Sequence, residues 1–160
     1  MRLEGSCHCD KVRFSLDAPE PVPYLRCFCS ICRKTDGSGG FGINLGTLVE
    51  GMEVEGEEHI RVYDPVGKRP GGRVDGSGRR FCGQCGSPLW NWDASWPHLI
   101  HPHAGAIDTA LPAPPTHVDI MLGSAMHWAL AGLAAPEKSF DAYPDKALAD
   151  WHRRHGLTSE

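Results

Sequence analysis

The seven cysteines of this 160-residue chain fall into three tight clusters, and this clustering constrains the fold more than any other feature. The clusters are a C-x-C pair, a C-x-C-x-x-C triad and a C-x-x-C pair, at Cys7 and Cys9, at Cys27, Cys29 and Cys32, and at Cys82 and Cys85. Seven cysteines cannot all pair, and cysteines two positions apart are poorly placed for a disulfide. Short turns rich in cysteine are typical of metal sites, so we predict metal binding.

The two outer pairs together supply four thiolates. A structural zinc ion usually takes four ligands in tetrahedral geometry, and two cysteine turns from distant parts of a chain can provide them. A glycine follows each cysteine of the C-x-x-C pair, and glycine tolerates the positive φ of a zinc-knuckle turn. We therefore predict a structural zinc on Cys7, Cys9, Cys82 and Cys85. The alternative is that one or both pairs are free buried thiols.

The triad is left with three ligands and one open position. Three protein ligands with a vacancy for water or substrate are typical of a catalytic zinc site, so we predict that Cys27, Cys29 and Cys32 are catalytic residues that hold a second zinc. Sulfur is a soft donor, which makes a substrate thiolate a natural fourth ligand. The alternatives are a second structural site closed by a histidine, and a redox or free-thiol cluster.

Basic residues flank the triad. Arg26, Arg33 and Lys34 can offset the negative charge of a zinc ion held by three thiolates, or can receive an anionic ligand. Three histidines near tryptophans are candidates either to line a pocket or to close the second zinc site: His98, His101 and His103.

Length and charge exclude several function classes. The length suits one domain over residues 1–160, with roughly 70% of the unfolded surface buried on folding. The net charge is −4 and no basic stripe is present, so we expect no nucleic-acid partner. The start of the sequence lacks an apolar signal segment, and the weakly polar run at residues 125–135 is too short to span a bilayer. These features predict a cytoplasmic protein with no membrane partner.

Short strands joined by turns are the predicted secondary structure, because the chain contains 19 glycines and 13 prolines. Alternating apolar residues predict strands at 11–16, 59–63 and 117–122, and shorter extended segments are expected at 24–26, 41–45, 47–49 and 89–92. Residues 50–58 are expected to form a solvated acidic hairpin, and residues 64–78 a mobile surface loop. One helix is predicted at the C-terminus, with Asp145 as its N-cap, an apolar stripe through Trp151, and Gly156 as its stop.

Several segments together resemble one known family. They are residues 5–9, 12–14, 27–34 and 81–89, followed by residues 104–108, residues 115–118 and Trp128. They are similar to the glutathione-dependent formaldehyde-activating enzyme family, also called the centromere protein V family. The resemblance covers nearly the whole chain and includes all seven cysteines.

This resemblance implies a fold and a chemistry. The fold would be a mainly β, Mss4-like arrangement of short antiparallel strands, with a structural zinc and a short C-terminal helix. The activity would be that of a carbon–sulfur lyase that forms S-hydroxymethylglutathione from formaldehyde and glutathione. The thiolate of glutathione would approach the second zinc, which is expected to be the more labile one, and Arg33 and Lys34 would bind the glutathione carboxylates. The alternative is a non-catalytic glutathione or thiol carrier, or a protein-binding zinc module.

Overall fold

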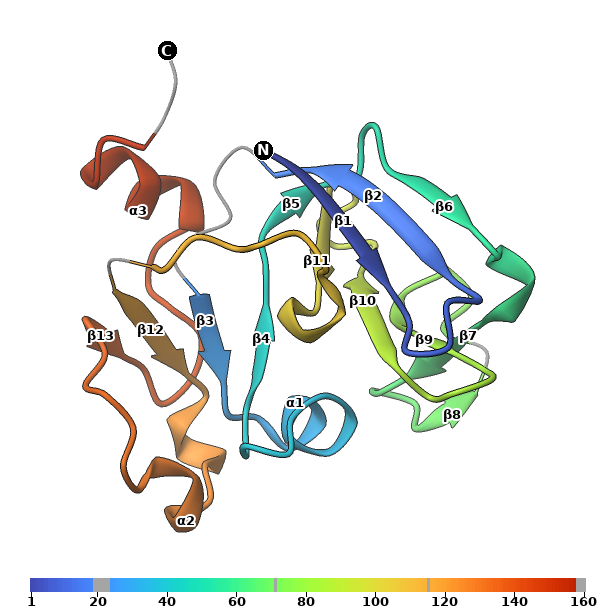
Figure 1. The fold of residues 1–160 in the computed structure, drawn as a ribbon. Helices are drawn as coiled ribbons and strands as arrows, with labels where there is room; N and C mark the ends of the chain where they lie inside the picture. The colour runs from blue at the N-terminus through green and yellow to red at the C-terminus, as the bar shows by residue number, and fades with distance from the viewer. Residues whose placement is uncertain (19–23, 71, 115, 158–160) are drawn as a thin grey trace. The chain divides into compact units, whose positions relative to one another are not determined.

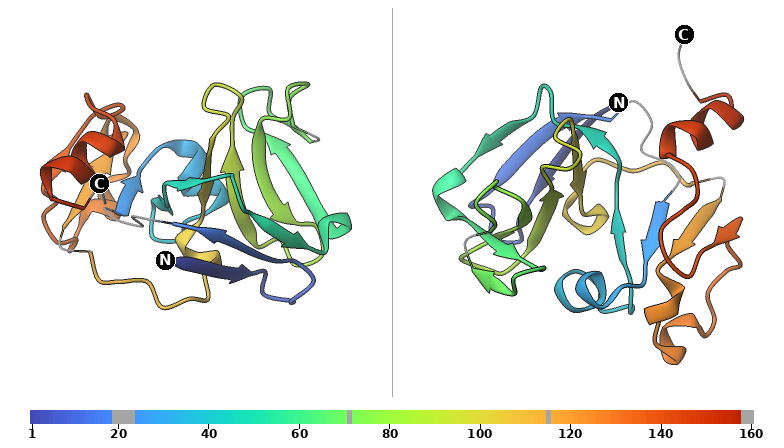
Figure 2. Two further views of the ribbon diagram at one scale, coloured as in Figure 1. Left: turned by 90° about the horizontal axis from the view of Figure 1, so that it is seen from above. Right: turned by 180° about the vertical axis from the view of Figure 1, so that it is seen from behind.

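The computed structural model describes residues 1–18, 24–70, 72–114 and 116–157. Contacts divide the chain into two compact units, and each unit contains two separate stretches of sequence (Figures 1 and 2). The first unit consists of Met1–Pro19 and Asn44–Pro112, and the second of Glu20–Ile43 and Ala113–Glu160. The organisation as one domain therefore stays a prediction, and the two units are described separately.

The first unit contains two sheets. A three-stranded antiparallel sheet has the order β1 (Arg2–Ser6), β2 (Arg13–Asp17), β6 (Glu53–Glu55). A six-stranded antiparallel sheet has the order β5 (Thr47–Leu48), β11 (Leu99–Pro102), β10 (Pro88–Trp92), β9 (Gly78–Cys82), β7 (Ile60–Asp64), β8 (Arg69–Pro70). Among the described residues of this unit, the 3-10 turn η1 (Glu57–His59) connects β6 to β7, and the 3-10 turn η2 (Ala104–Ala106) follows β11.

The alternating residues of β2 form much of the core of this unit. Phe14 and Leu16 point inward and are almost completely buried, and the ring of Phe14 meets that of Trp90 on β10 edge-on, with centroids 5.1 Å apart. Gly5 lies opposite Phe14 in the β1–β2 pair, and a Cβ there would come within 2.4 Å of the Phe14 ring and of the Ala106 carbonyl oxygen. A side chain at position 5 would therefore displace the central aromatic pair.

The second unit is a four-stranded sheet with short helices. The sheet has the order β13 (Lys138–Ser139), β12 (His117–Ile120), β3 (Tyr24–Cys27), β4 (Gly42–Asn44), with β4 at the boundary between the units. The other elements are α1 (Ser30–Thr35), η3 (Leu122–Ser124), α2 (His127–Leu130) and α3 (Leu148–Arg154). Strand β12 runs parallel to both β3 and β13, a direction that alternation in the sequence does not reveal.

The prediction of a mainly β chain of short strands with a short C-terminal helix is confirmed. The predicted start of that helix is wrong: its N-cap is Ala147, which makes no side-chain cap, and not Asp145. Gly156 has a φ of 64° just after the helix, as expected for a stop. Helices α1 and α2 and strand β11 were not predicted from the sequence, and β8 lies within the segment 64–78 that was predicted to be a loop.

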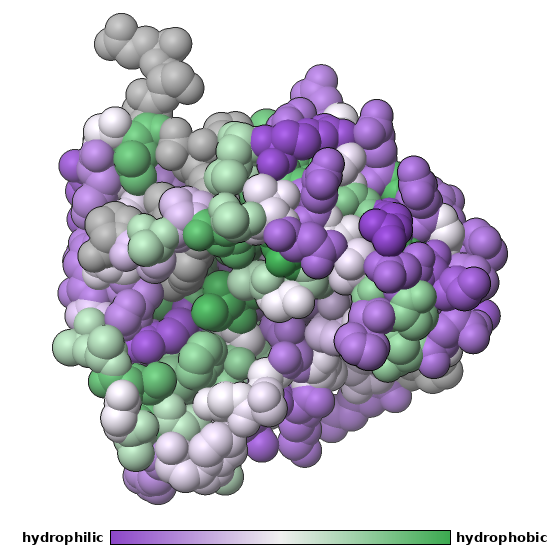
Figure 3. All heavy atoms as spheres, viewed as in Figure 1, coloured by the Kyte–Doolittle hydropathy of each residue, from purple (hydrophilic) through white to green (hydrophobic). Residues whose placement is uncertain are grey.

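Short helices leave apolar side chains at the surface. Three apolar residues in and beside α2 are 40%, 58% and 42% exposed: Met126, Trp128 and Leu130. Figure 3 shows pale and green atoms in the lower left region, where Figure 1 places α2.

None of the described helices has both the length and the apolar character needed to span a bilayer.

A buried ion pair joins β3 to β12. Arg26 and Asp119 are register partners, and the guanidinium donates two hydrogen bonds to the carboxylate, at 2.6 and 2.9 Å. The same guanidinium donates to the carbonyl oxygen of Ala134 and lies over the ring of Phe41. Both side chains are at least nine-tenths buried. The pair therefore neutralises two buried charges. It also fixes the register of β3 against β12 at the position next to Cys27.

We expect Asp119→Asn to lower the free energy of unfolding by about 3–5 kcal/mol, because it leaves the Arg26 charge buried without its partner. The control is Asp17→Asn, which removes an exposed single contact with Arg2 at a carboxylate that is 64% exposed, and should cost less than about 1 kcal/mol. Urea unfolding followed by tryptophan fluorescence measures both. Equal effects of the two substitutions would contradict the importance of the buried pair.

Candidate metal centres

Four sulfur atoms meet in the first unit. Cys7 and Cys9 lie in the turn between β1 and β2, Cys82 ends β9, and Cys85 lies in the turn before β10. The four sulfur atoms all lie within 4.8 Å of one another. The Sγ atoms of Cys7 and Cys9 are 3.6 Å apart, and those of Cys9 and Cys82 are 3.8 Å apart. A regular tetrahedron around an ion with bonds of about 2.3 Å to sulfur has edges of about 3.8 Å, so this sulfur set fits a tetrahedral metal ion.

Backbone amides around these turns point at the sulfurs. Val12 N–H donates to Cys7 Sγ at 3.3 Å, and Gln84 N–H donates to Cys82 Sγ at 3.4 Å. Such donors stabilise thiolates, the form that binds a metal. A hydrogen bond with the Ser87 hydroxyl lowers the pKa of the Cys85 thiol to about 5, which favours its thiolate as well.

Positive φ angles shape both turns. Asp10 has a φ of 58° in the first turn, and Gly86 has a φ of 79° in the second, where its N–H donates to the Cys82 carbonyl. Gly83 is not among the described residues with positive φ. The expectation from the glycine pattern therefore holds for one of the two glycines after the cysteines.

Three sulfur atoms meet in the second unit. Cys27 ends β3, Cys29 is the N-cap of α1, and Cys32 lies in the first turn of that helix, where its N–H donates to Cys29 Sγ at 3.3 Å. These sulfur atoms also lie within 4.8 Å of one another. Cys27 and Cys32 are buried, whereas Cys29 is partly exposed. Helix α1 thus places the sulfurs of Cys29 and Cys32 next to Cys27 at the end of β3. Solvent reaches this cluster at Cys29.

The three sulfurs of this second cluster share their protons unequally. Hydrogen bonds with the thiols of Cys27 and Cys32 lower the pKa of Cys29 to about 2. The same contacts, first with Cys29 and then with Cys32, together with burial, raise the pKa of Cys27. Cys29 therefore forms a thiolate more readily than Cys27, and a cation placed there would displace the remaining protons.

Neither sulfur group in the described part of the chain includes a histidine. The three candidate histidines lie in the first unit, and the structure shows other surroundings for them. His101 Nδ1 lies 3.0 Å from the Leu45 carbonyl oxygen, its ring meets Trp96 edge-on at 4.7 Å, and burial lowers its pKa. His103 is almost fully buried and His98 is exposed.

The cations around the triad differ in what they contact. Arg26 binds Asp119, so its charge is already balanced. Arg33 and Lys34 occupy the last turn of α1; Arg33 is half-buried and Lys34 is exposed. Arg33 Nε is buried and has no hydrogen-bond partner among the described residues. The binding of an anion by Arg33 and Lys34 stays a prediction.

Asp119 was not predicted as a site residue, although an acidic residue within an alternating apolar strand is a signal for a buried charge partner.

Comparison with known proteins agrees with this arrangement of cysteines. The sequence profile described as "Glutathione-dependent formaldehyde-activating enzyme" matches residues 2–122. The chain belongs to this family. The matched region includes all seven cysteines. Residues 123–160, which include α2, β13 and α3, lie beyond the match.

Two known proteins are similar to this chain, one in sequence and one in fold. A Halomonas elongata protein, provisionally named as a glutathione-dependent formaldehyde-activating enzyme, is 45% identical over 161 residues, which cover 98% of each chain. A crystal structure of a Rhodobacter sphaeroides protein covers 70% of this chain and 92% of its own, with a TM-score of 0.53 and 23% identity. The second protein is similar to this chain in fold.

The two sulfur clusters should respond differently to loss of a ligand. We expect Cys82→Ser to remove the metal ion of the four-sulfur cluster and to cause loss of β structure, because the ion ties two distant turns together. Cys29→Ser should remove only the second metal ion and leave the fold intact. Elemental analysis of purified protein, with far-ultraviolet circular dichroism, measures both. A full metal content in either variant would contradict the corresponding ligand set.

Proposed function

We propose that this chain combines glutathione with formaldehyde to form S-hydroxymethylglutathione, at a zinc ion held by Cys27, Cys29 and Cys32. The observation that carries the proposal is the incomplete sulfur set: three sulfurs gathered within 4.8 Å, one of them partly exposed. Family membership and the name of the Halomonas elongata relative support the two substrates. A second zinc on the four-sulfur cluster would be structural.

The proposed reaction is an addition of a thiolate to a carbonyl group. A carbon–sulfur bond forms between the glutathione sulfur and the formaldehyde carbon, the carbonyl π pair moves to oxygen, and that oxygen takes a proton while the thiol loses one. The reverse reaction breaks the carbon–sulfur bond, which is why the activity is that of a carbon–sulfur lyase. When bound, zinc would lower the pKa of a thiol at the open position and keep it as the nucleophilic thiolate.

The protein's own residues would bind and orient glutathione. Burial of Cys27 and Cys32 leaves the side of Cys29 as the approach to the open position. Arg33 and Lys34 follow directly in α1 and would receive glutathione carboxylates. Holding the sulfur and the carboxylates at once would orient the thiol and reduce the entropy cost of the reaction.

The reaction is tested by mixing protein, formaldehyde and glutathione and following adduct formation by NMR exchange spectroscopy. We expect the protein to accelerate the reaction above the spontaneous rate. We expect Cys29→Ser to reduce this acceleration about a hundredfold or more, because the substitution removes a ligand of the proposed metal ion. Ser124→Ala, in η3 and outside the cluster, is the control. Glutathione binding without acceleration would contradict the enzymatic proposal and favour a thiol carrier.

Lys34→Gln tests the binding of the substrate anion. We expect it to raise KM for glutathione about threefold to tenfold with little change in kcat, because an exposed cation contributes modestly to binding and not to the chemical step. Lys11→Gln removes an exposed charge in the other unit and is the control. An unchanged KM in Lys34→Gln would exclude this residue from the glutathione site.

A further inference from the structure

Two parallel strands of the second unit end side by side at the edge that carries the cysteine triad. In the β3–β12 ladder Cys27 is the register partner of Ile120, and the N–H of the next residue, Phe28, donates to the Ile120 carbonyl oxygen at 3.0 Å. The segments that follow the two strands therefore leave from the same edge. One segment is α1 with the triad, and the other leads through η3 to α2. Figure 1 and the right-hand view of Figure 2 show α1 and α2 at this end of the strands.

This shared edge is a natural place for a substrate. In open sheets of parallel strands, ligands bind beyond the carboxyl ends of the strands, where the connecting segments can contact them. The triad lies in one of the two connecting segments. The segment after β12 is therefore a candidate to complete the substrate site.

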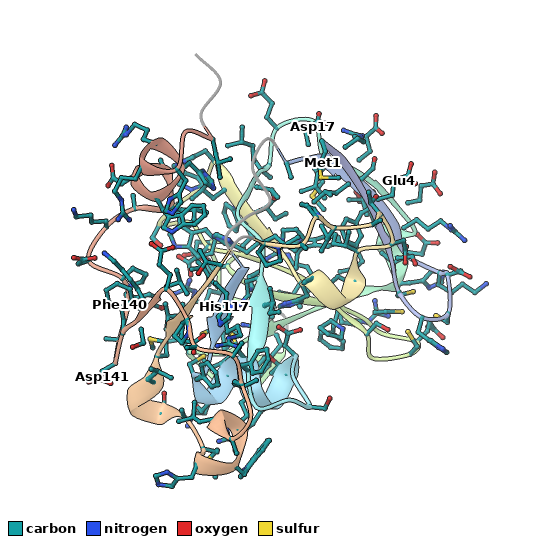
Figure 4. All side chains as sticks on the ribbon, turned by 60° about the vertical axis from the view of Figure 1, so that its left-hand side comes forward. Met1, Glu4, Asp17, His117, Phe140 and Asp141 are labelled. Carbon is teal, nitrogen blue, oxygen red and sulfur yellow. The ribbon has the colours of Figure 1, made fainter. Side chains whose placement is uncertain are left out.

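Backbone hydrogen bonds hold the segment after β12 in place. The N–H groups of Leu122 and Gly123 donate to the carbonyl oxygens of Phe140 and Asp141, which are labelled in Figure 4, at 3.0 and 3.1 Å. Met121, the residue before them, packs against the buried cluster that contains two cysteines of the triad. The segment thus begins beside the triad and has a fixed course.

Helix α2 packs against the loop that joins α1 to β4. A Cβ at Gly40 in this loop would come within 2.3 Å of Ala129 Cβ and 3.1 Å of the Trp128 ring. A Cβ at Gly42, where β4 begins, would lie 3.2 Å from Cys32 Cβ. Trp128 and the triad therefore border the same short loop, and glycine in that loop allows both to approach closely.

Apolar side chains of this segment face solvent. Met126, Trp128 and Leu130, which we call the apolar patch, are all exposed, and Trp128 is the most exposed of them. A single apolar residue at a surface needs no explanation, but several beside a reactive site point to a ligand. Neither substrate of the proposed reaction uses such a surface, because formaldehyde has no side chain and glutathione is polar. The apolar patch therefore fits a substrate that carries an apolar group.

We propose that the apolar patch binds the side chain of an aldehyde larger than formaldehyde, so that the substrates include aldehydes with an aromatic or branched alkyl group. This inference rests on the proposed function. The same bonds change as with formaldehyde: the glutathione sulfur bonds to the aldehyde carbon, the carbonyl π pair moves to oxygen, and that oxygen takes a proton while the thiol loses one. The apolar group packs on the indole of Trp128, which removes apolar surface from water.

Two stable thioethers test the binding without turnover. S-(2-phenylethyl)glutathione has the carbon skeleton of the phenylacetaldehyde adduct, and S-ethylglutathione lacks the ring. We expect isothermal titration calorimetry to show about tenfold tighter binding of the first, because its phenyl ring packs on the indole. Equal affinities, or no binding of either thioether, would overturn the proposal.

Variants locate the contact. Trp128→Ala should bring the ratio of the two affinities close to one. Tyr143→Ala removes another exposed aromatic ring of the same unit and should leave the ratio unchanged. An equal loss in both variants, or an unchanged ratio in Trp128→Ala, would overturn the proposal. A dimer in light scattering that Trp128→Ala converts to a monomer would also overturn it, because the apolar patch would then bind a second copy.

Reaction rates separate this inference from the proposed function. Phenylacetaldehyde should gain about tenfold more acceleration over its spontaneous addition to glutathione than acetaldehyde, which lacks the ring. Acceleration with formaldehyde but no preference for phenylacetaldehyde would overturn this inference and leave the proposed function standing. If the protein accelerates no aldehyde, the proposed function fails, and the thioether affinities decide whether the apolar patch binds apolar groups.

Discussion

The convergence of four sulfur atoms from two distant turns is the constraint on which the first unit depends. Cys7 and Cys9 enter from the hairpin of the three-stranded sheet, and Cys82 and Cys85 from a hairpin of the six-stranded sheet. A metal ion bound to all four would join the two sheets at their turns, and Cys7 and Cys82 pack in the same core cluster as Phe14 and Trp90. Structural zinc contributes roughly 10–16 kcal/mol of apparent binding energy in small domains, comparable to the stability of a whole domain.

The second unit is stabilised by an ion pair. Its sheet is held by a bidentate ion pair between Arg26 and Asp119, one residue from Cys27. The charge of Arg26 does not offset the negative charge of the triad, because Asp119 already neutralises it. The positive charge available near the triad therefore comes from the end of α1, where Arg33 and Lys34 also lie favourably in the field of the helix C-terminus.

The two sulfur clusters differ in ways that suit different roles. The four-sulfur cluster is complete, with two of its cysteines buried and amide donors on the sulfurs. The three-sulfur cluster has no fourth ligand among the described His, Cys, Asp and Glu residues of its unit, and its partly exposed member caps a short helix. A closed set suits a structural ion, and an open set suits a substrate thiolate.

The grouping of the cysteines and the positions of several strands could be predicted from the sequence. Cysteine spacing divided the seven thiols among three short turns, and the four-ligand requirement of a structural zinc led us to combine the two outer pairs. Alternation placed β2, β7 and β12 within a few residues, since burial on one face repeats every second residue. Tertiary structure decided the rest. The parallel pairing of β12 and the partner of Arg26 depend on segments far apart in sequence. The helix begins after Ala147 rather than Asp145 and has no side-chain cap, and burial of Trp151 stabilises it more than a capping side chain would.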